Sequence, residues 1–231
     1  MELSIVIVII GLIVAGVIGG QALVRQAKLR SAVAEIQSYN VALTTFKLEY
    51  NGVAGDFNRA TSYWGGGVTS DGNGNGIVRP YQTEGYWAWQ HLALAEIIPG
   101  SYAGVQQGVN TIGSAVPKSS FPNSGYGFIS GSRANYFWTG KYSQQVEHFI
   151  RWGGLYLAGT NTRIGRIILT VKEAKAIDDK MDDGLPGLGR YVIQLNSSPN
   201  CVTTNVTTTS LYDLSNQGVQ CYFNYVWEFR R

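Results

Sequence analysis

The chain starts with a long apolar run that holds one acidic residue. Glu2 stands at the beginning of this run, and no further charged residue appears before Arg25. As a helix with a rise of ~1.5 Å per residue, residues 3–20 would extend about 27 Å, close to the ~30 Å core of a bilayer. The run therefore predicts a helix of membrane-spanning length. An ionised carboxylate at the edge of such a segment is costly and usually has a charged partner.

Beyond this run, apolar residues recur at intervals of three and four positions, with charged residues between them. This spacing is typical of an amphipathic helix with one apolar face. The first proline is Pro80, whereas Asn51-Gly52 is a pair that commonly ends helices. We therefore predict one uninterrupted helix over Glu2–Tyr50. It is membrane-like over residues 1–24 and packs on a globular head through its second half.

The head, residues 51–231, shows the mixed periodicity of an α+β domain with an antiparallel sheet. Helical spacing predicts helices over Glu84–Ile98, with Pro99-Gly100 as its stop, and over Lys172–Met181. Strands are predicted where β-branched and aromatic runs lie between turn residues. These runs are Tyr126–Ile129, Tyr136–Thr139, Gly154–Ala158, Ile164–Val171, Arg190–Leu195 and Tyr222–Phe229.

Composition narrows the class of protein. Charged residues make up only 14% of the chain, aromatic residues 12%, and glycine occurs 29 times. This composition is typical of an exported, loop-rich or β-rich domain rather than of a cytosolic enzyme. The net charge of +3 comes from scattered lysines and arginines. No specific nucleic acid is predicted as a partner, because no compact basic patch with interleaved aromatic residues is present.

After Met1 the chain reads Glu2-Leu3-Ser4-Ile5-Val6-Ile7-Val8-Ile9-Ile10-Gly11-Leu12-Ile13-Val14. This segment closely resembles the N-terminal segment of type IV pilins and type II secretion pseudopilins. The resemblance implies a subunit that polymerises with copies of itself, through its N-terminal helix, into an extracellular pilus-like filament. It also implies that Glu2 pairs with the N-terminal amine of a neighbouring subunit.

The same resemblance implies partners and a location before assembly. In that family a prepilin peptidase of the inner membrane removes a basic leader, the new N-terminus is methylated, and the pilus assembly machinery then takes up the subunit. The subunit spans the inner membrane once, with its head outside the cytoplasm.

One feature departs from the family pattern, because only Met1 precedes Glu2 where the pattern has four residues. We expect that a leader and three further residues precede this sequence in the native chain; alternatively, Met1 is the translation start and no cleavage site exists. Arg25, Lys28 and Arg30 all follow the apolar run and, taken alone, would place the C-terminal side in the cytoplasm. A basic leader would reverse that orientation.

The apolar half contains four glycines, Gly11, Gly16, Gly19 and Gly20. Small residues let helices approach closely in lipid-like surroundings, although each glycine costs a helix ~1 kcal/mol relative to alanine. The frequent proline of the family would fall at Gly19. We interpret the glycines either as ordinary membrane-helix residues or as a stretch that loosens when subunits pack into a filament.

The chain has two cysteines, Cys201 and Cys221. An even, small number of cysteines in an exported protein argues for a disulfide, and pilins commonly close a C-terminal loop in this way. The alternative is a pair of buried free thiols.

Residues 71–78 alternate oxygen-bearing side chains with glycines, in a spacing that resembles the calcium loop of an EF-hand. The candidate ligands are Asp71, Asn73, Asn75, the carbonyl of Ile77, Gln82 and Glu84. Gln82 stands where an EF-hand has glutamate, and Glu84 could replace it. The segment predicts either a calcium site or a plain glycine-asparagine turn.

A second cation candidate is the acidic group Asp178, Asp179, Asp182 and Asp183. Carboxylates crowded in this way repel one another, and a cation would relieve the repulsion. Solvated acids at the end of a helix are the plainer interpretation.

The sequence contains no G-x-S-x-G, P-loop or H-E-x-x-H motif, and its histidines are only His91 and His148. We interpret both histidines as packing residues and predict a structural protein rather than an enzyme, with no required cofactor and calcium as an optional ligand. The alternatives are a pseudopilin of a type II secretion system and a monomeric, membrane-anchored periplasmic binding domain.

Overall fold

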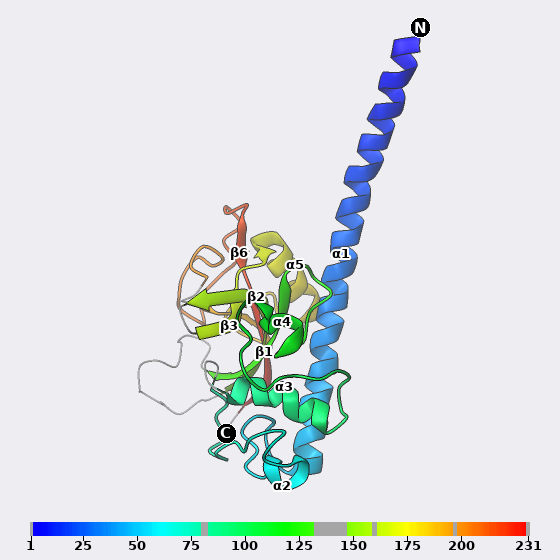
Figure 1. The fold of residues 1–231 in the computed structure, drawn as a ribbon. Helices are drawn as coiled ribbons and strands as arrows, with labels where there is room; N and C mark the ends of the chain where they lie inside the picture. The colour runs from blue at the N-terminus through cyan, green and yellow to red at the C-terminus, as the bar shows by residue number, and fades with distance from the viewer. Residues whose placement is uncertain (1, 80–82, 132–146, 159–160, 196–197, 230–231) are drawn as a thin grey trace.

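The computed structural model describes residues 2–79, 83–131, 147–158, 161–195 and 198–229. The helices are α1 (Glu2–Tyr50), α2 (Ala60–Trp64), α3 (Glu84–Leu94), η1 (Gly108–Asn110), α4 (Thr111–Ser114) and α5 (Val171–Met181). The strands are β1 (Ser124–Gly131), β2 (Glu147–Ala158), β3 (Asn161–Arg166), β4 (Leu169–Thr170), β5 (Tyr191–Ile193), β6 (Val219–Cys221) and β7 (Phe223–Phe229). The first half of α1 stands clear of the head, and its second half runs along the head (Figure 1). The fold is α+β, as predicted.

The predicted long helix is confirmed as a single element, Glu2–Tyr50. It ends where predicted, because Asn51 takes a left-handed backbone conformation (φ 50°) that cannot continue the helix.

An antiparallel sheet forms the centre of the head, with the strand order β1-β2-β7-β5 and with β3 paired to β2. The strands β4 and β6 form a separate two-stranded sheet. Sequence reasoning places β1, the end of β2, β5 and β7 correctly, and the predicted strand Tyr136–Thr139 lies outside the described residues.

The prediction of one strand over Ile164–Val171 is wrong. β3 ends at Arg166, β4 covers only Leu169–Thr170, and Val171 is the first residue of α5. The helix at Val171 starts with a capping box, in which Thr170 Oγ1 accepts from the Glu173 amide (3.2 Å) and the Glu173 carboxylate accepts from the Thr170 amide (2.9 Å). These bonds satisfy amide groups at the start of α5, and so they favour a helix over a continued strand.

The predicted helix Glu84–Ile98 is too long, because α3 ends at Leu94. Glu96 adopts φ 58°, its amide donates to the Ala93 carbonyl (3.0 Å), and the Ile97 amide donates to the Leu92 carbonyl (3.0 Å). This pair of bonds is a Schellman motif, which ends the helix before the predicted stop at Pro99-Gly100.

The second half of α1 forms one wall of the core. Its buried apolar residues are Leu29, Ala32, Val33, Ile36, Ala42, Leu43 and Phe46. Tyr39 of the same helix packs against Trp89 of α3 and against Tyr126 of β1, with ring centroids 5.0 Å apart in both pairs. α1 is therefore part of the fold of the head and not a tether to it.

Polar contacts also join α1 to the head. Arg25 forms an ion pair with Glu173 of α5, and Arg25 Nη2 donates to the Glu173 carboxylate at 2.9 Å. Farther along the helix, the Glu35 carboxylate accepts from Tyr126 Oη (2.6 Å) and from Ser119 Oγ (3.2 Å). Because Arg25 and Glu35 lie ten positions apart, the two contacts fix the direction of the helix against the head.

The predicted disulfide is confirmed. Cys201 and Cys221 are bonded, with their Cα atoms 5.4 Å apart, and close a loop with a sequence separation of 20. Both sulfur-bearing residues are buried, and Cys221 is the last residue of β6.

Candidate functional site

The most prominent surface of the molecule is the apolar half of α1. An 18-residue window of this helix has a mean hydropathy of 2.6, and none of it is buried inside the structure. From Ile5 to Val24, its large apolar side chains are all half-exposed or more, with Leu12 at 69% and Leu23 at 74%. A helix that is apolar on every face is normally covered by lipid or by other helices. By length and composition, α1 is suited to cross a membrane.

The four predicted assembly glycines lie in this half of α1. A Cβ atom built at Gly11, Gly16, Gly19 or Gly20 would meet no atom within 4 Å. The fold of the single chain therefore does not require glycine at these positions. Gly16 and Gly20 are also four positions apart, the spacing that brings two helices into close contact in lipid. Glu2 belongs to the helix by its backbone, but its side chain lies outside the described residues.

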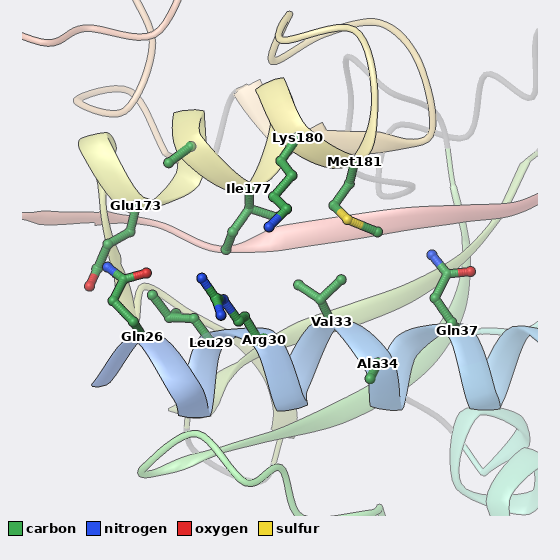
Figure 2. Close-up of a pocket in the computed structure, with 11 residues that line it drawn as sticks. Gln26, Leu29, Arg30, Val33, Ala34, Gln37, Glu173, Ile177, Lys180 and Met181 are labelled. Carbon is green, nitrogen blue, oxygen red and sulfur yellow. The ribbon is translucent and has the colours of Figure 1, made fainter. Parts of the chain in front are cut away.

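A groove of about 580 Å³ separates part of α1 from α5. It is lined by Gln26, Leu29, Arg30, Val33, Ala34 and Gln37 of α1 and by Glu173, Ala176, Ile177, Lys180 and Met181 of α5 (Figure 2). The lining is apolar at its base, and the side chains of Arg30 and Lys180 extend into the space between the helices. Glu173 is engaged by Arg25 and by the capping box. The groove therefore offers no unengaged carboxylate among the described residues for acid–base chemistry.

The segment 71–78 folds as a compact turn whose side-chain oxygens bond to the chain itself. Both carboxylate oxygens of Asp71 accept from Thr61, one from its amide (2.7 Å) and one from its hydroxyl (2.9 Å). Asn73 Oδ1 accepts from the Asn75 amide (3.0 Å), and Asn75 Oδ1 accepts from the Ile77 amide (2.8 Å). These are Asx turns, which account for the alternating pattern without a cation. Calcium binding by this segment stays a prediction.

The centre of this turn is Asp56, which the sequence analysis did not include among the candidate residues. Its buried carboxylate accepts from the amides of Asn75 (3.1 Å) and Gly76 (2.5 Å). Gly74 and Gly76 have φ values of 70° and 75°, which explains the glycines of the motif. No short-range spacing links position 56 to this segment, so the sequence holds no direct signal for the contact.

The last two candidate calcium ligands are Gln82 and Glu84. Gln82 is outside the described residues. Glu84 is buried, accepts from the Arg79 amide (3.1 Å), and has a pKa raised first by burial and also by the nearby charge of Asp56.

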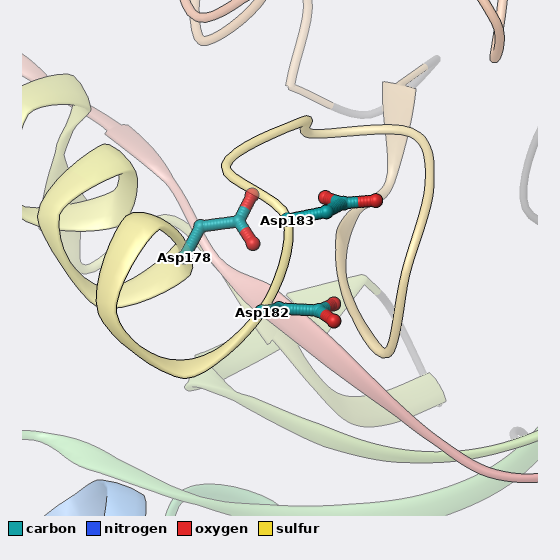
Figure 3. Close-up of side chains that lie close together, drawn as sticks. All are labelled: Asp178, Asp182 and Asp183. Atoms are coloured by element: carbon teal, nitrogen blue, oxygen red, sulfur yellow. The ribbon is translucent and has the colours of Figure 1, made fainter.

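The acidic group is the second cluster with candidate chemistry. The structure brings Asp178, Asp182 and Asp183 together, with one carboxylate oxygen of each within 4.8 Å of the others (Figure 3). Asp179 lies apart from them and forms an ion pair with Lys175 (2.6 Å) on the exposed side of α5. Burial raises the pKa of Asp178 to about 7; the hydrogen bond from Tyr212 opposes this rise, and the charges of Asp183 and Asp182 add to it.

Both histidines are buried, as predicted. His91 Nδ1 accepts from the Gly55 amide (3.2 Å), and its Nε2 lies 3.3 Å from the Ser70 carbonyl oxygen. His148 Nδ1 lies 2.7 Å from Ser130 Oγ, and its ring stacks on Phe128.

A comparison of the chain with protein-family models, with curated proteins and with solved structures gives no match.

Proposed function

We propose that this chain is the structural subunit of a type IV pilus-like filament. In this proposal the apolar half of α1 forms the filament core with copies of itself, and the head forms the outer surface. Before assembly the same half holds the subunit in the inner membrane, with the head outside the cytoplasm. A prepilin peptidase and the pilus assembly machinery are its partners there.

One observation carries the proposal: a single helix provides both an uncovered apolar surface and a wall of the core of the head. Residues of the apolar window are exposed throughout, whereas Ile36, Leu43 and Phe46 of the same helix are almost fully buried. A simple membrane anchor needs no such continuity. In a filament, continuity places every head at a defined position relative to the helical core.

The glycines and Glu2 support the same proposal. The glycines give neighbouring helices room that the single chain does not use. Glu2 is the sole charged residue before Arg25, and Arg25 is ~34 Å farther along the helix at a rise of ~1.5 Å per residue. A carboxylate in an apolar core needs a cation, and the N-terminal amine of an adjacent chain is the nearest positive group. That pairing would also set the axial register of subunits.

The test is a strain that carries only a Glu2→Ala subunit. We expect a strong loss of surface fibres, measured by negative-stain microscopy of sheared material with mass spectrometry of the subunit. Membrane insertion and formation of the Cys201–Cys221 disulfide should continue, because neither depends on Glu2. Glu49→Ala is the matched control, since Glu49 is an exposed acid on the same helix.

Abundant, normal fibres from the Glu2→Ala strain would contradict the proposed pairing. A wild-type strain that forms no fibre, but fails in protein secretion when the subunit is deleted, would favour the pseudopilin alternative. A monomeric membrane anchor would form no fibres, and Glu2→Ala would leave its membrane insertion and its head unchanged.

A further inference from the structure

At the C-terminal end of α5, Asp178 holds a buried carboxylate that its surroundings satisfy only in part. Its exposed fraction is 0%, and its Oδ2 accepts from the hydroxyl of Tyr212 (2.7 Å). Its other oxygen, Oδ1, has no hydrogen-bond partner among the described residues. The Gly184 amide lies near enough to favour the charged form of Asp178, but it makes no hydrogen bond to Oδ1. A buried carboxylate oxygen without a donor is costly, so it requires either a proton or a cation.

Two further carboxylates are held in place near the carboxylate of Asp178. Asp182 Oδ2 accepts from the amides of Tyr191 (2.8 Å) and Arg190, and Asp183 Oδ1 accepts from the Leu185 amide (2.9 Å). Each of the two side chains is therefore held in place through one of its carboxylate oxygens. Figure 3 shows the carboxylate of Asp178 pointing from α5 toward the loop that carries the other two.

The basic side chains near this cluster are engaged elsewhere in the described part of the chain. Lys175 pairs with Asp179 at 2.6 Å, and Arg190 Nη1 donates to Tyr225 Oη at 3.2 Å. In the described part of the chain, neither of these basic side chains forms an ion pair with the three carboxylates, whose ligand oxygens lie within 4.8 Å of one another.

We propose that Asp178, Asp182 and Asp183 bind one calcium ion at the C-terminal end of α5. The donors are all hard oxygen atoms, which select calcium or magnesium over zinc or copper. They come from a helix end and an irregular loop, an arrangement that calcium tolerates and that the strict octahedral geometry of magnesium does not. The ion would use the buried oxygen of Asp178 and would join α5 to the loop before β5.

The site also extends to the disulfide-closed loop. Tyr212 lies between Cys201 and Cys221 in sequence and donates to Asp178, while the neighbouring Asp213 amide donates to the Cys201 carbonyl (3.0 Å). Calcium would therefore stabilise α5, the loop before β5 and the C-terminal loop together.

The experiment uses the full chain in detergent micelles, first stripped with chelator and then given calcium chloride. Thermal unfolding is followed by circular dichroism, and calcium binding by isothermal titration calorimetry. We expect calcium to raise the midpoint of unfolding of the wild-type chain. Asp183→Asn, an exposed position, should fold and form the disulfide but bind calcium about tenfold more weakly or worse. Asp178→Asn should abolish the rise.

Two controls separate this site from other acids. Asp179→Asn, one position along α5 but paired with Lys175, should keep the full calcium response, and so should Asp71→Asn in the turn 71–78. A response lost in Asp71→Asn but kept in Asp183→Asn would overturn the proposal. So would a wild-type midpoint that is identical with calcium and with chelator, which would mean that a proton alone neutralises Asp178.

Discussion

The imidazole of His91 packs beside Phe46 of α1 and Trp64 of α2, with ring centroids 6.3 Å and 5.6 Å away. Its two nitrogens contact Gly55 and Ser70, so one side chain joins four segments of the head. Burial is the main cause that lowers its pKa from 6.5 to about 4, and the Ser70 carbonyl opposes this shift only in part. The folded head therefore keeps this ring neutral under conditions in which an unfolded chain would protonate it.

This difference predicts a loss of stability in acid. As the pH falls from 6.5 to 4, the unfolded chain takes up a proton at His91 and the folded chain does not. The contribution is fully present above pH 6.5 and is lost across this window, by roughly 3 kcal/mol of unfolding free energy. His91→Gln should flatten the dependence, because glutamine does not titrate. Urea unfolding of the full chain in detergent at pH 7 and pH 4.5 measures the change in unfolding free energy for the wild type and for His91→Gln. An equal change in both proteins would contradict the role given to His91.

At the scale of elements, the sequence predicts best what depends on neighbours along the chain. α1 and α5 follow from helical spacing over many residues, and their bounds agree closely with the prediction. β6 was missed because Val219–Cys221 is short and its pairing depends on Leu169–Thr170, far away in sequence. Asp56 was missed for the same reason, since its hydrogen bonds reach the segment 71–78. In contrast, the early end of α3 and the start of α5 at Val171 follow from local capping motifs that the predictions did not use.

The capping box of α5 gives a prediction at this scale. Thr170→Ala removes the side chain that accepts from the Glu173 amide, and it should lower the unfolding free energy by about 1 kcal/mol. Glu173→Gln keeps a hydrogen-bonding group but loses the ion pair with Arg25, whose side chain is 43% exposed. Its effect should be smaller than about 1 kcal/mol and should fade with added salt.

Thermal and urea unfolding of the two variants at low and high salt measure both effects. A larger loss for Glu173→Gln than for Thr170→Ala would mean that the contact with α1, rather than the cap, holds this end of α5.

At the scale of the whole molecule, α1 has two halves with different requirements. Residues of the second half are constrained by the core of the head, whereas the first half has no described contact that would restrict it to particular residues. Constraints on the first half must therefore come from the membrane or from other copies of the chain.

This asymmetry predicts that Gly20→Leu leaves the single chain unchanged but reduces fibre formation. A Cβ atom built at Gly20 meets nothing within 4 Å in the monomer, but a leucine side chain there would keep a neighbouring helix at a distance. Gly66→Leu is the control, because this head glycine also has open space around it. Neither variant should lower the midpoint of thermal unfolding, and counts of sheared fibres should fall only for Gly20→Leu. Normal fibres from Gly20→Leu would show that no close helix contact forms at this position.

The continuity of α1 has a mechanical consequence for a fibre built in the proposed way. Each head would be joined to the fibre axis by an unbroken helix whose second half packs against aromatic side chains of the head, such as Trp89 and Tyr126. A pulling force on the head would pass directly into the axis, since no slack linker lies between them to extend first. Under load such a fibre would lengthen only by sliding or unwinding its helices, or by unfolding whole heads.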